Sequence, residues 1–107
     1  MPDAHKYFVK ILIPAYNAEK YLHRTMQTIL AQSFKDFAVV ICDDRSEDGT
    51  YKIARQYASE NKNVFVCQSK YGKNASAARN TALDFGVNAE YTWFVDADDF
   101  IPDVNAL

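Results

Sequence analysis

Three aspartates stand close together near the end of the chain, at Asp96, Asp98 and Asp99. They directly follow the apolar run 91–95, which predicts a buried strand. Crowded carboxylates repel one another unless a cation lies between them, and oxygen-rich clusters suit Mg²⁺ or Mn²⁺. Because ligands of open α/β sheets bind beyond the carboxyl ends of the strands, this cluster predicts a metal or nucleotide site. A solvated acidic turn is the alternative interpretation.

A second acidic pair, Asp43 and Asp44, follows the apolar run 37–42. The carboxyl ends of parallel strands meet at one edge of a sheet, so this pair is expected near the first cluster. Ser46 or Asp48 is expected to cap the helix that follows, which gives part of this polar loop a structural role.

The turn after the first predicted strand, 8–14, carries Pro14, Ala15, Tyr16 and Asn17. Pro14 is expected to end the strand because it has no backbone N–H, and Asn17 is expected to cap the next helix. These residues fit an ordinary strand–turn–helix connection. They equally fit a site in which Tyr16 and the neighbouring backbone form the wall of a base or sugar pocket.

The basic residues that could bind a phosphate lie between residues 69 and 80. Arg79 stands early in a helix predicted over 76–85, and its guanidinium could grip a phosphate with two hydrogen bonds. Lys70 and Lys73 precede it in an irregular loop and could assist. Each of these charges, taken alone, also fits a solvated surface position.

Strands and helices are predicted to alternate along the whole chain, which favours a parallel sheet with helices on both faces. The apolar runs predict strands at 8–14, 37–42, 63–68 and 91–95, and helical periodicity predicts helices at 18–32, 48–59 and 76–85. The expected architecture is a Rossmann-like three-layer α/β sandwich, formed by residues 1–107 as a single domain.

Composition narrows the classes of function. The chain has 107 residues, 49% of them hydrophobic, and a formal net charge of −2. This balance argues against a protein that binds nucleic acid through its phosphate backbone. No apolar run is long enough for a membrane span, so we expect a cytoplasmic chain without membrane contact, although its parent protein could be membrane-associated. Cys42 and Cys67 lie in apolar runs and are expected to be two buried, reduced thiols rather than a disulfide or a metal pair.

Taken in order, four motifs resemble the N-terminal half of a family 2 glycosyltransferase of the GT-A fold. They are Ile-Pro-Ala-Tyr-Asn, Asp-Asp-Arg-Ser-Glu-Asp-Gly-Thr, Ala-Arg-Asn and Asp-Ala-Asp-Asp, and the resemblance runs from about Phe8 to Asp103. It implies a mainly parallel sheet of order 3-2-1-4. It also implies an inverting, metal-dependent transfer of sugar from a nucleotide-sugar, UDP-sugar in particular, to a saccharide or other acceptor in polysaccharide or glycoconjugate biosynthesis.

The resemblance also implies roles for particular residues. In it, Pro14, Ala15 and Tyr16 line the nucleoside pocket, Asp44 accepts a hydrogen bond from uracil, and Arg79 contacts the diphosphate or steadies the acidic motif. The expected nucleotide-sugar site comprises Pro14, Ala15, Tyr16, Asp43, Asp44, Lys73, Arg79, Asp96 and Ala97. The Mn²⁺ or Mg²⁺ would be held by Asp98 with Asp96, and Asp99 is the alternative ligand.

The resemblance further implies that the acceptor half of the domain is missing from these residues. The general base is expected beyond Leu107, so this truncated GT-A domain is expected to bind the donor and to be inactive alone. The last predicted strand would then lie at an open edge of the sheet. Tyr91, Trp93 and Phe94 would be exposed there or would drive self-association.

Three other classes share parts of this pattern. A response-regulator receiver also has paired acids at strand ends, but its acidic pair would follow the first strand. A nucleotidyltransferase would have a glycine-rich basic loop after that strand, where this chain has Pro-Ala-Tyr-Asn. A non-catalytic module that binds a nucleotide or nucleotide-sugar remains a third interpretation.

Overall fold

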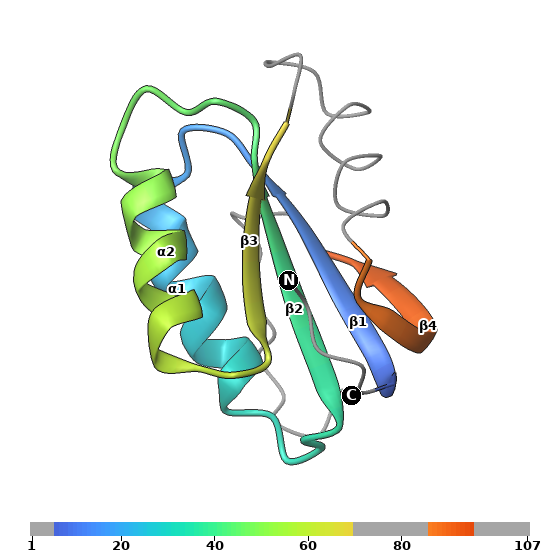
Figure 1. Ribbon diagram of the computed structural model, residues 1–107. Coiled ribbons are helices and arrows are strands. Elements are labelled where there is room, and N and C mark those ends of the chain that lie inside the picture. The colour runs from blue at the N-terminus through green and yellow to red at the C-terminus, as the bar shows by residue number, and fades with distance from the viewer. Residues whose placement is uncertain (1–5, 70–85, 96–107) are drawn as a thin grey trace.

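The computed structural model describes residues 6–69 and 86–95 and shows an α/β fold built on a parallel sheet (Figure 1). The described elements are β1 (Lys6–Ala15), α1 (Glu19–Leu30), β2 (Phe37–Asp43), α2 (Thr50–Glu60), β3 (Val64–Gln68) and β4 (Asn88–Phe94). All neighbouring strands pair in parallel, in the order β3-β2-β1-β4. The expected order 3-2-1-4 is confirmed.

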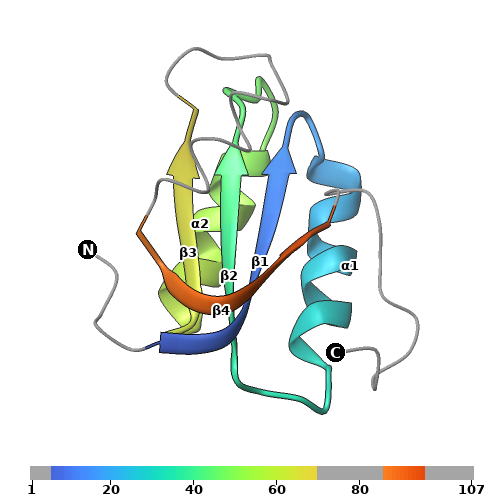
Figure 2. The same cartoon turned by 90° about the vertical axis from the view of Figure 1, so that its right-hand side faces the viewer.

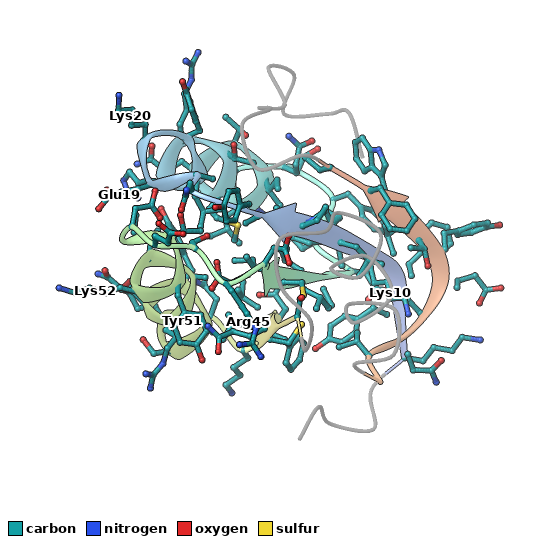
Figure 3. The ribbon with its side chains drawn as sticks, turned by 90° about the horizontal axis from the view of Figure 1, so that it is seen from above. Lys10, Glu19, Lys20, Arg45, Tyr51 and Lys52 are labelled. Atoms are coloured by element: carbon teal, nitrogen blue, oxygen red, sulfur yellow. The ribbon has the colours of Figure 1, made fainter. Side chains whose placement is uncertain are left out.

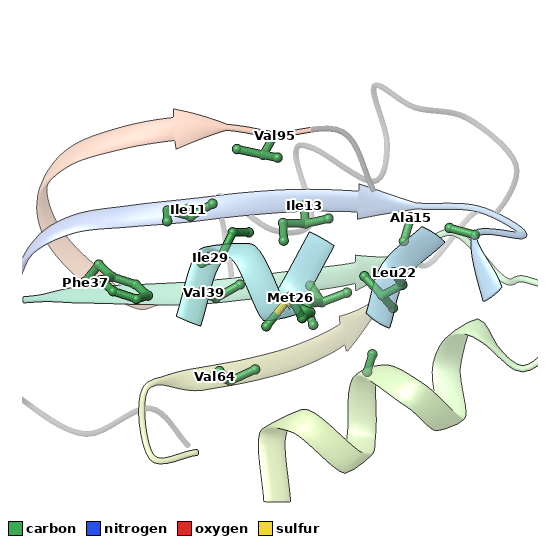
Figure 4. Packing of buried hydrophobic residues seen from close by; sticks show 13 residues of the cluster. Ile11, Ile13, Ala15, Leu22, Met26, Ile29, Phe37, Val39, Val64 and Val95 are labelled. Carbon is green, nitrogen blue, oxygen red and sulfur yellow. The ribbon is translucent and has the colours of Figure 1, made fainter. Parts of the chain in front are cut away.

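Both described helices pack on one face of the sheet (Figure 1). Leu22, Met26 and Ile29 recur at helical spacing along α1 and are fully buried. Figure 4 shows them directed toward the sheet, where Ile11 and Ile13 of β1 belong to the same cluster. Burying an aliphatic side chain of this size stabilises a fold by about 1.5–3 kcal/mol, so this interface contributes much of the stability.

The opposite face of the central strands is equally buried. Leu12, Ala38, Val40 and Cys42 form a second apolar cluster and have no exposed surface. Strands buried on both faces explain why their sequences read as continuous apolar runs without alternation. The third predicted helix lies outside the described residues, so the complete three-layer arrangement stays a prediction.

β1 differs from the sequence-based expectation in where it ends. β1 continues to Ala15, one residue past Pro14. Leu12 accepts a hydrogen bond from the Val95 N–H, and Ala15 accepts one from the Asp44 N–H. The backbone groups of successive residues in a strand point in alternate directions, so those of Pro14 point toward β4, as those of Leu12 do. Pro14 lies beyond the last residue of β1 that pairs with β4. Its missing N–H therefore breaks no hydrogen bond of the sheet.

β4 begins at Asn88, earlier than predicted, and is exposed along most of its length, so the expectation of a buried strand over 91–95 is wrong except at Val95. It pairs with β1 and curves strongly beside it (Figure 2). Tyr91 and Phe94 are both exposed, and the Tyr91 ring contacts the Phe8 ring edge-on at 5.1 Å. Neither of the described helices is long and apolar enough to cross a membrane.

Candidate functional site

The carboxyl ends of three strands lie side by side at one edge of the sheet. In the register of the sheet, Ala15 of β1 is opposite Asp43 of β2, and Asp43 is opposite Gln68 of β3. Figure 3 looks onto this edge from above. The two polar loops predicted to form a site, after β1 and after β2, therefore meet here. We call this region, residues 14–19 and 43–50, the carboxyl edge.

Asp44 is the most unusual side chain of the carboxyl edge. Its backbone N–H donates a hydrogen bond of 2.7 Å to the carbonyl of Ala15, which fixes the start of the loop against β1. The residue is only 4% exposed. Its Oδ1 atom is buried and has no hydrogen-bond partner among the residues that the structure describes. An unpaired buried carboxylate oxygen is costly, so its presence calls for a partner such as a ligand or an ordered water.

Asp43, the neighbouring acid, is fully buried but well satisfied. Its carboxylate accepts hydrogen bonds from the backbone N–H of Ser46 at 3.1 and 3.3 Å and from the Gln68 side chain at 3.2 Å. The structure therefore gives Asp43 a positioning role beneath the loop that carries Asp44. Its predicted direct contact with a nucleotide-sugar stays a prediction.

The turn after β1 presents mainly Tyr16 to the surface. Tyr16 is 44% exposed, whereas Ala15 is buried and uses its carbonyl to hold Asp44. Pro14 is half-buried. These three residues were predicted to line a pocket, and the structure brings them next to Asp44.

Asn17 does not cap α1, contrary to expectation, because the N-cap position is Ala18. Asn17 has a left-handed backbone with φ of 48°, which asparagine tolerates better than most residues. Its side-chain oxygen accepts a 2.8 Å hydrogen bond from the Glu47 N–H, and its own N–H donates to the Ser46 hydroxyl at 2.8 Å. Asn17 therefore ties the loop after β1 to the loop after β2.

Asp48 and Thr50 strengthen this connection. The Asp48 carboxylate accepts hydrogen bonds from the backbone N–H of Glu19 at 3.2 Å and from that of Thr50 at 2.9 Å. The Thr50 hydroxyl accepts one from the Ala18 N–H at 2.8 Å. Neither Ser46 nor Asp48 is the N-cap of α2, which is Gly49. The short polar side chains of these loops instead serve the donors at the start of both helices.

Hydrogen bonding gives Asp48 an unusual acidity. Burial raises the pKa of its carboxyl group, but the hydrogen bonds from Thr50 and Glu19 outweigh burial and lower the pKa below its ordinary value of 3.8. Asp48 is thus held in its charged form by the Thr50 hydroxyl and by backbone N–H groups at two helix N-termini, where negative charge is also favoured by the helix dipoles.

Cys42 and Cys67 face each other across the ladder between β2 and β3. Both are free thiols, with Cys42 buried and Cys67 half-buried. The hydrogen bond with Cys67, together with burial, raises the pKa of Cys42. The same hydrogen bond lowers the pKa of Cys67, against the effect of its own burial. The expectation of reduced thiols agrees with this arrangement, but the expectation that Cys67 is buried is wrong.

The remaining predicted site residues lie outside the described part of the chain. They are Lys73, Arg79, Asp96, Ala97, Asp98 and Asp99. Within residues 6–69 and 86–95, no group of three or more histidine, cysteine or acidic side chains is placed to hold a metal ion. The predicted contacts of these residues with a diphosphate and a cation stay predictions.

Curated relatives resemble the chain over most of its length. It is 34% identical over 92 residues to the Escherichia coli UDP-Glc:alpha-D-GlcNAc-diphosphoundecaprenol beta-1,3-glucosyltransferase WfaP, covering 86% of this chain and 36% of that protein. It is 39% identical over 101 residues to E. coli chondroitin synthase, covering 92% of this chain and 14% of the synthase. The chain thus spans well under half the length of these relatives.

Solved structures show the same fold. S. aureus TarS 1–349 in complex with UDP matches with a TM-score of 0.79 and 33% identity, over 88% of this chain and 28% of that one. The Pyrobaculum calidifontis mannosyltransferase PcManGT, in complex with GDP-Man and Mn²⁺, matches with a TM-score of 0.75 and 26% identity, over 97% of this chain and 31% of that one. The sheet and its two described helices correspond to part of the GT-A fold of TarS. Residues 10–105 match the sequence pattern of Glycosyl transferase family 2, and the chain belongs to that family.

Proposed function

We propose that this chain forms the nucleotide-sugar-binding part of an inverting, metal-dependent glycosyltransferase whose donor is a UDP-sugar. The observation that carries the proposal is the buried Asp44 Oδ1 atom, which has no partner in the described part of the chain and lies at the carboxyl edge. The relatives support the choice of donor. WfaP is named for a UDP-Glc donor, and TarS structures contain UDP and UDP-GlcNAc.

Asp44 would accept a hydrogen bond from the imide N–H of uracil. A charged acceptor in a buried position strengthens such a bond, and the ligand donor would relieve the cost of the unpaired oxygen. Tyr16 stands exposed on the adjacent turn and would form a wall of the nucleoside pocket. Pro14 and Ala15 would contribute backbone to the same wall.

The phosphate end of the donor would lie toward the residues outside the described part. Asp98, with Asp96 or Asp99, would hold Mn²⁺ or Mg²⁺, and Arg79 and Lys73 would approach the diphosphate. Carboxylates are suitable ligands for both ions. When bound, the cation supplies charge neutralisation for the departing nucleoside diphosphate.

Sugar transfer would need more than these residues. The acceptor hydroxyl, on a saccharide or other acceptor, must lose its proton to a general base, and we place that base beyond Leu107. We therefore propose that the 107-residue chain binds its donor but does not transfer sugar alone, and that it acts in the cytoplasm in polysaccharide or glycoconjugate biosynthesis. Normal transfer rates with the purified chain would contradict this part of the proposal.

Isothermal titration calorimetry with UDP, GDP and CDP, with and without Mn²⁺, tests the binding proposal. UDP is expected to bind most tightly, to need the metal, and to lose affinity in Asp98→Ala. Asp44→Asn removes the charge without changing shape, and we expect roughly tenfold weaker UDP binding because charge-assisted bonds are about twice as strong as neutral ones.

Asp36→Asn is the matched control for Asp44→Asn. Asp36 is exposed and precedes β2, whereas Asp44 follows it, so the two substitutions remove the same charge at opposite ends of one strand. The control is expected to bind UDP like the unmodified chain. Equal, metal-independent affinity for all three nucleotides, unchanged by Asp44→Asn, would reject the proposed function.

A further inference from the structure

Arg45 holds a backbone conformation that its side chain does not favour. Its φ is 57°, in the left-handed region where residues with a Cβ atom are strained. Among the described residues without glycine's freedom, only Arg45 and Asn17 have positive φ, and both belong to the carboxyl edge. Asparagine tolerates this region, but arginine has no such tendency, so the strain at Arg45 needs a cause.

The neighbours of Arg45 impose the strain. Asp44 is fixed before it, because its N–H donates to Ala15, and Ser46 is fixed after it, because its N–H donates to the Asp43 carboxylate. The chain must turn sharply between these two anchors. A glycine would satisfy the same turn without strain, so the loop geometry alone does not call for an arginine here.

The side chain of Arg45 lies at the carboxyl edge. Its Nε atom donates a 3.1 Å hydrogen bond to the carbonyl of Ser69, directly after β3. The guanidinium therefore extends from the end of β2 to the end of β3, and the residue is exposed (Figure 3). A guanidinium carries five donors in a planar fork, so it is able to hold Ser69 and a ligand together.

Asp44 and Arg45 together offer an acceptor and a donor at adjacent positions of one loop. A nucleobase such as uracil presents the complementary pair, an imide N–H flanked by carbonyl oxygens. A phosphate would instead meet the carboxylates of Asp43 and Asp44 beside the guanidinium, which is an unfavourable environment for an anion. The base, which is neutral, avoids this repulsion.

We infer that Arg45 is a nucleobase-contacting residue, whose guanidinium donates to a carbonyl oxygen of the base while Asp44 accepts the neighbouring imide N–H. This inference rests on the proposed function, because it assigns a further residue to the same donor site. It gives the basic residues different roles. Arg45 would contact the base, whereas Arg79 and Lys73 are the residues proposed for the diphosphate.

The test compares three ligands that divide the donor into parts: UDP, uridine and inorganic pyrophosphate, each titrated in the presence of Mn²⁺ and followed by calorimetry or ligand-observed NMR. Arg45→Gly is expected to weaken the binding of UDP and of uridine by the same factor, about five- to tenfold, which corresponds to one lost hydrogen bond. Pyrophosphate binding should be unchanged. The thermal midpoint should stay equal or rise, because glycine accepts the left-handed backbone.

Arg55→Ala is the charge-matched control. Arg55 is exposed on α2, where its guanidinium lies 5.8 Å from the centre of the Tyr51 ring, and its loss should leave all three affinities unchanged. Unchanged uridine affinity in Arg45→Gly, or weakening of pyrophosphate alone, would overturn the inference while leaving UDP binding intact. Failure of the unmodified chain to bind UDP or uridine would instead reject the proposed function.

Discussion

The carboxylate of Asp48 accepts a hydrogen bond from the backbone N–H of Glu19, the first residue of α1, across a separation of 29 residues. The other carboxylate oxygen of Asp48 accepts a hydrogen bond from the backbone N–H of Thr50, the first residue of α2. One side chain therefore satisfies donors at the start of both helices. The loops that present Tyr16 and Asp44 are consequently parts of one hydrogen-bonded unit.

Replacing Asp48 should loosen this unit. We expect Asp48→Ala to lower the free energy of unfolding by about 2 kcal/mol, at the upper end for a lost helix cap, because donors of two helices lose their acceptor. Urea denaturation followed by circular dichroism measures this difference. Glu60→Ala, at the exposed carboxyl end of α2, is the control and should change stability by less than about 0.5 kcal/mol. Equal losses in the two variants would contradict the role given to Asp48.

The acidity of Asp48 predicts a pH dependence. Its folded-state pKa lies below the ordinary value of 3.8, so its contribution to stability is present above that value and is lost as pH falls below it. Asp48→Asn should therefore be less stable than the unmodified chain near pH 6, and the gap should narrow toward roughly pH 3. Thermal unfolding at a series of pH values checks the expectation, and a gap that is constant with pH would refute it.

The two thiols should differ in reactivity. Cys67 is half-buried and has a lowered pKa because of its hydrogen bond with Cys42, whereas the pKa of Cys42 is raised and its side chain is buried. Because the thiolate is the reactive form, iodoacetamide at about pH 8 should label Cys67 first. Peptide mass spectrometry at successive times measures the labelled fraction of each cysteine. In Cys67→Ser, labelling should nearly cease until denaturant is added, and early labelling of Cys42 would contradict this assignment.

The outer side of β4 should promote self-association. In the described part of the chain β4 pairs only with β1, and Tyr91 and Trp93 are 59% and 37% exposed. Its one charged side chain, Glu90, is engaged with Lys6 at 3.2 Å, so little on this strand opposes edge-to-edge pairing. Sedimentation velocity should show oligomers that increase with protein concentration.

Tyr91→Lys should shift that equilibrium to monomer, since an edge lysine opposes strand addition. Tyr21→Lys is the matched control, because Tyr21 is also half-exposed but lies on α1, away from β4. It should leave the oligomers unchanged. A chain that stays monomeric at every concentration before substitution would show that β4 is not an association surface.

The fold was predictable where burial dominates the sequence pattern. The strands of the parallel sheet follow from apolar runs such as 37–42, and helical periodicity predicts helices over 18–32 and 48–59, where α1 and α2 lie. Exposed β4 was harder to delimit. It begins at Asn88 within a polar stretch, because an exposed edge strand needs no apolar side chains to be stable in the sheet.

The location of the carboxyl edge was predictable, but the hydrogen bonds between its two loops were not. The position of Asp44 follows from its place after a buried strand. Asn17 and Asp48 were instead assigned local capping roles, because capping rules consider only nearby residues. Each of them has a partner in the other loop, about 30 residues away in sequence: the Glu47 N–H donates to Asn17, and the Glu19 N–H donates to Asp48. Asp48 also accepts from the nearby Thr50 N–H, as a local role predicts. The clearest signal in the sequence was the run of short polar side chains in the loop after β2, which includes Ser46, Asp48 and Thr50.

The central position of β1 has a consequence for the order of folding. Val9 lies opposite Phe37 on one side and opposite Tyr91 on the other, so the two ladders close chain loops of very different length. The ladder between β1 and β2 closes the shorter loop, so its formation costs less conformational entropy. Both of its strands are also synthesised before β4. On a ribosome, the strands and helices up to Gln68 would be in place, with Asp44 already seated against Ala15, before β4 emerges. The carboxyl edge would thus be assembled before β4 pairs with the other side of β1.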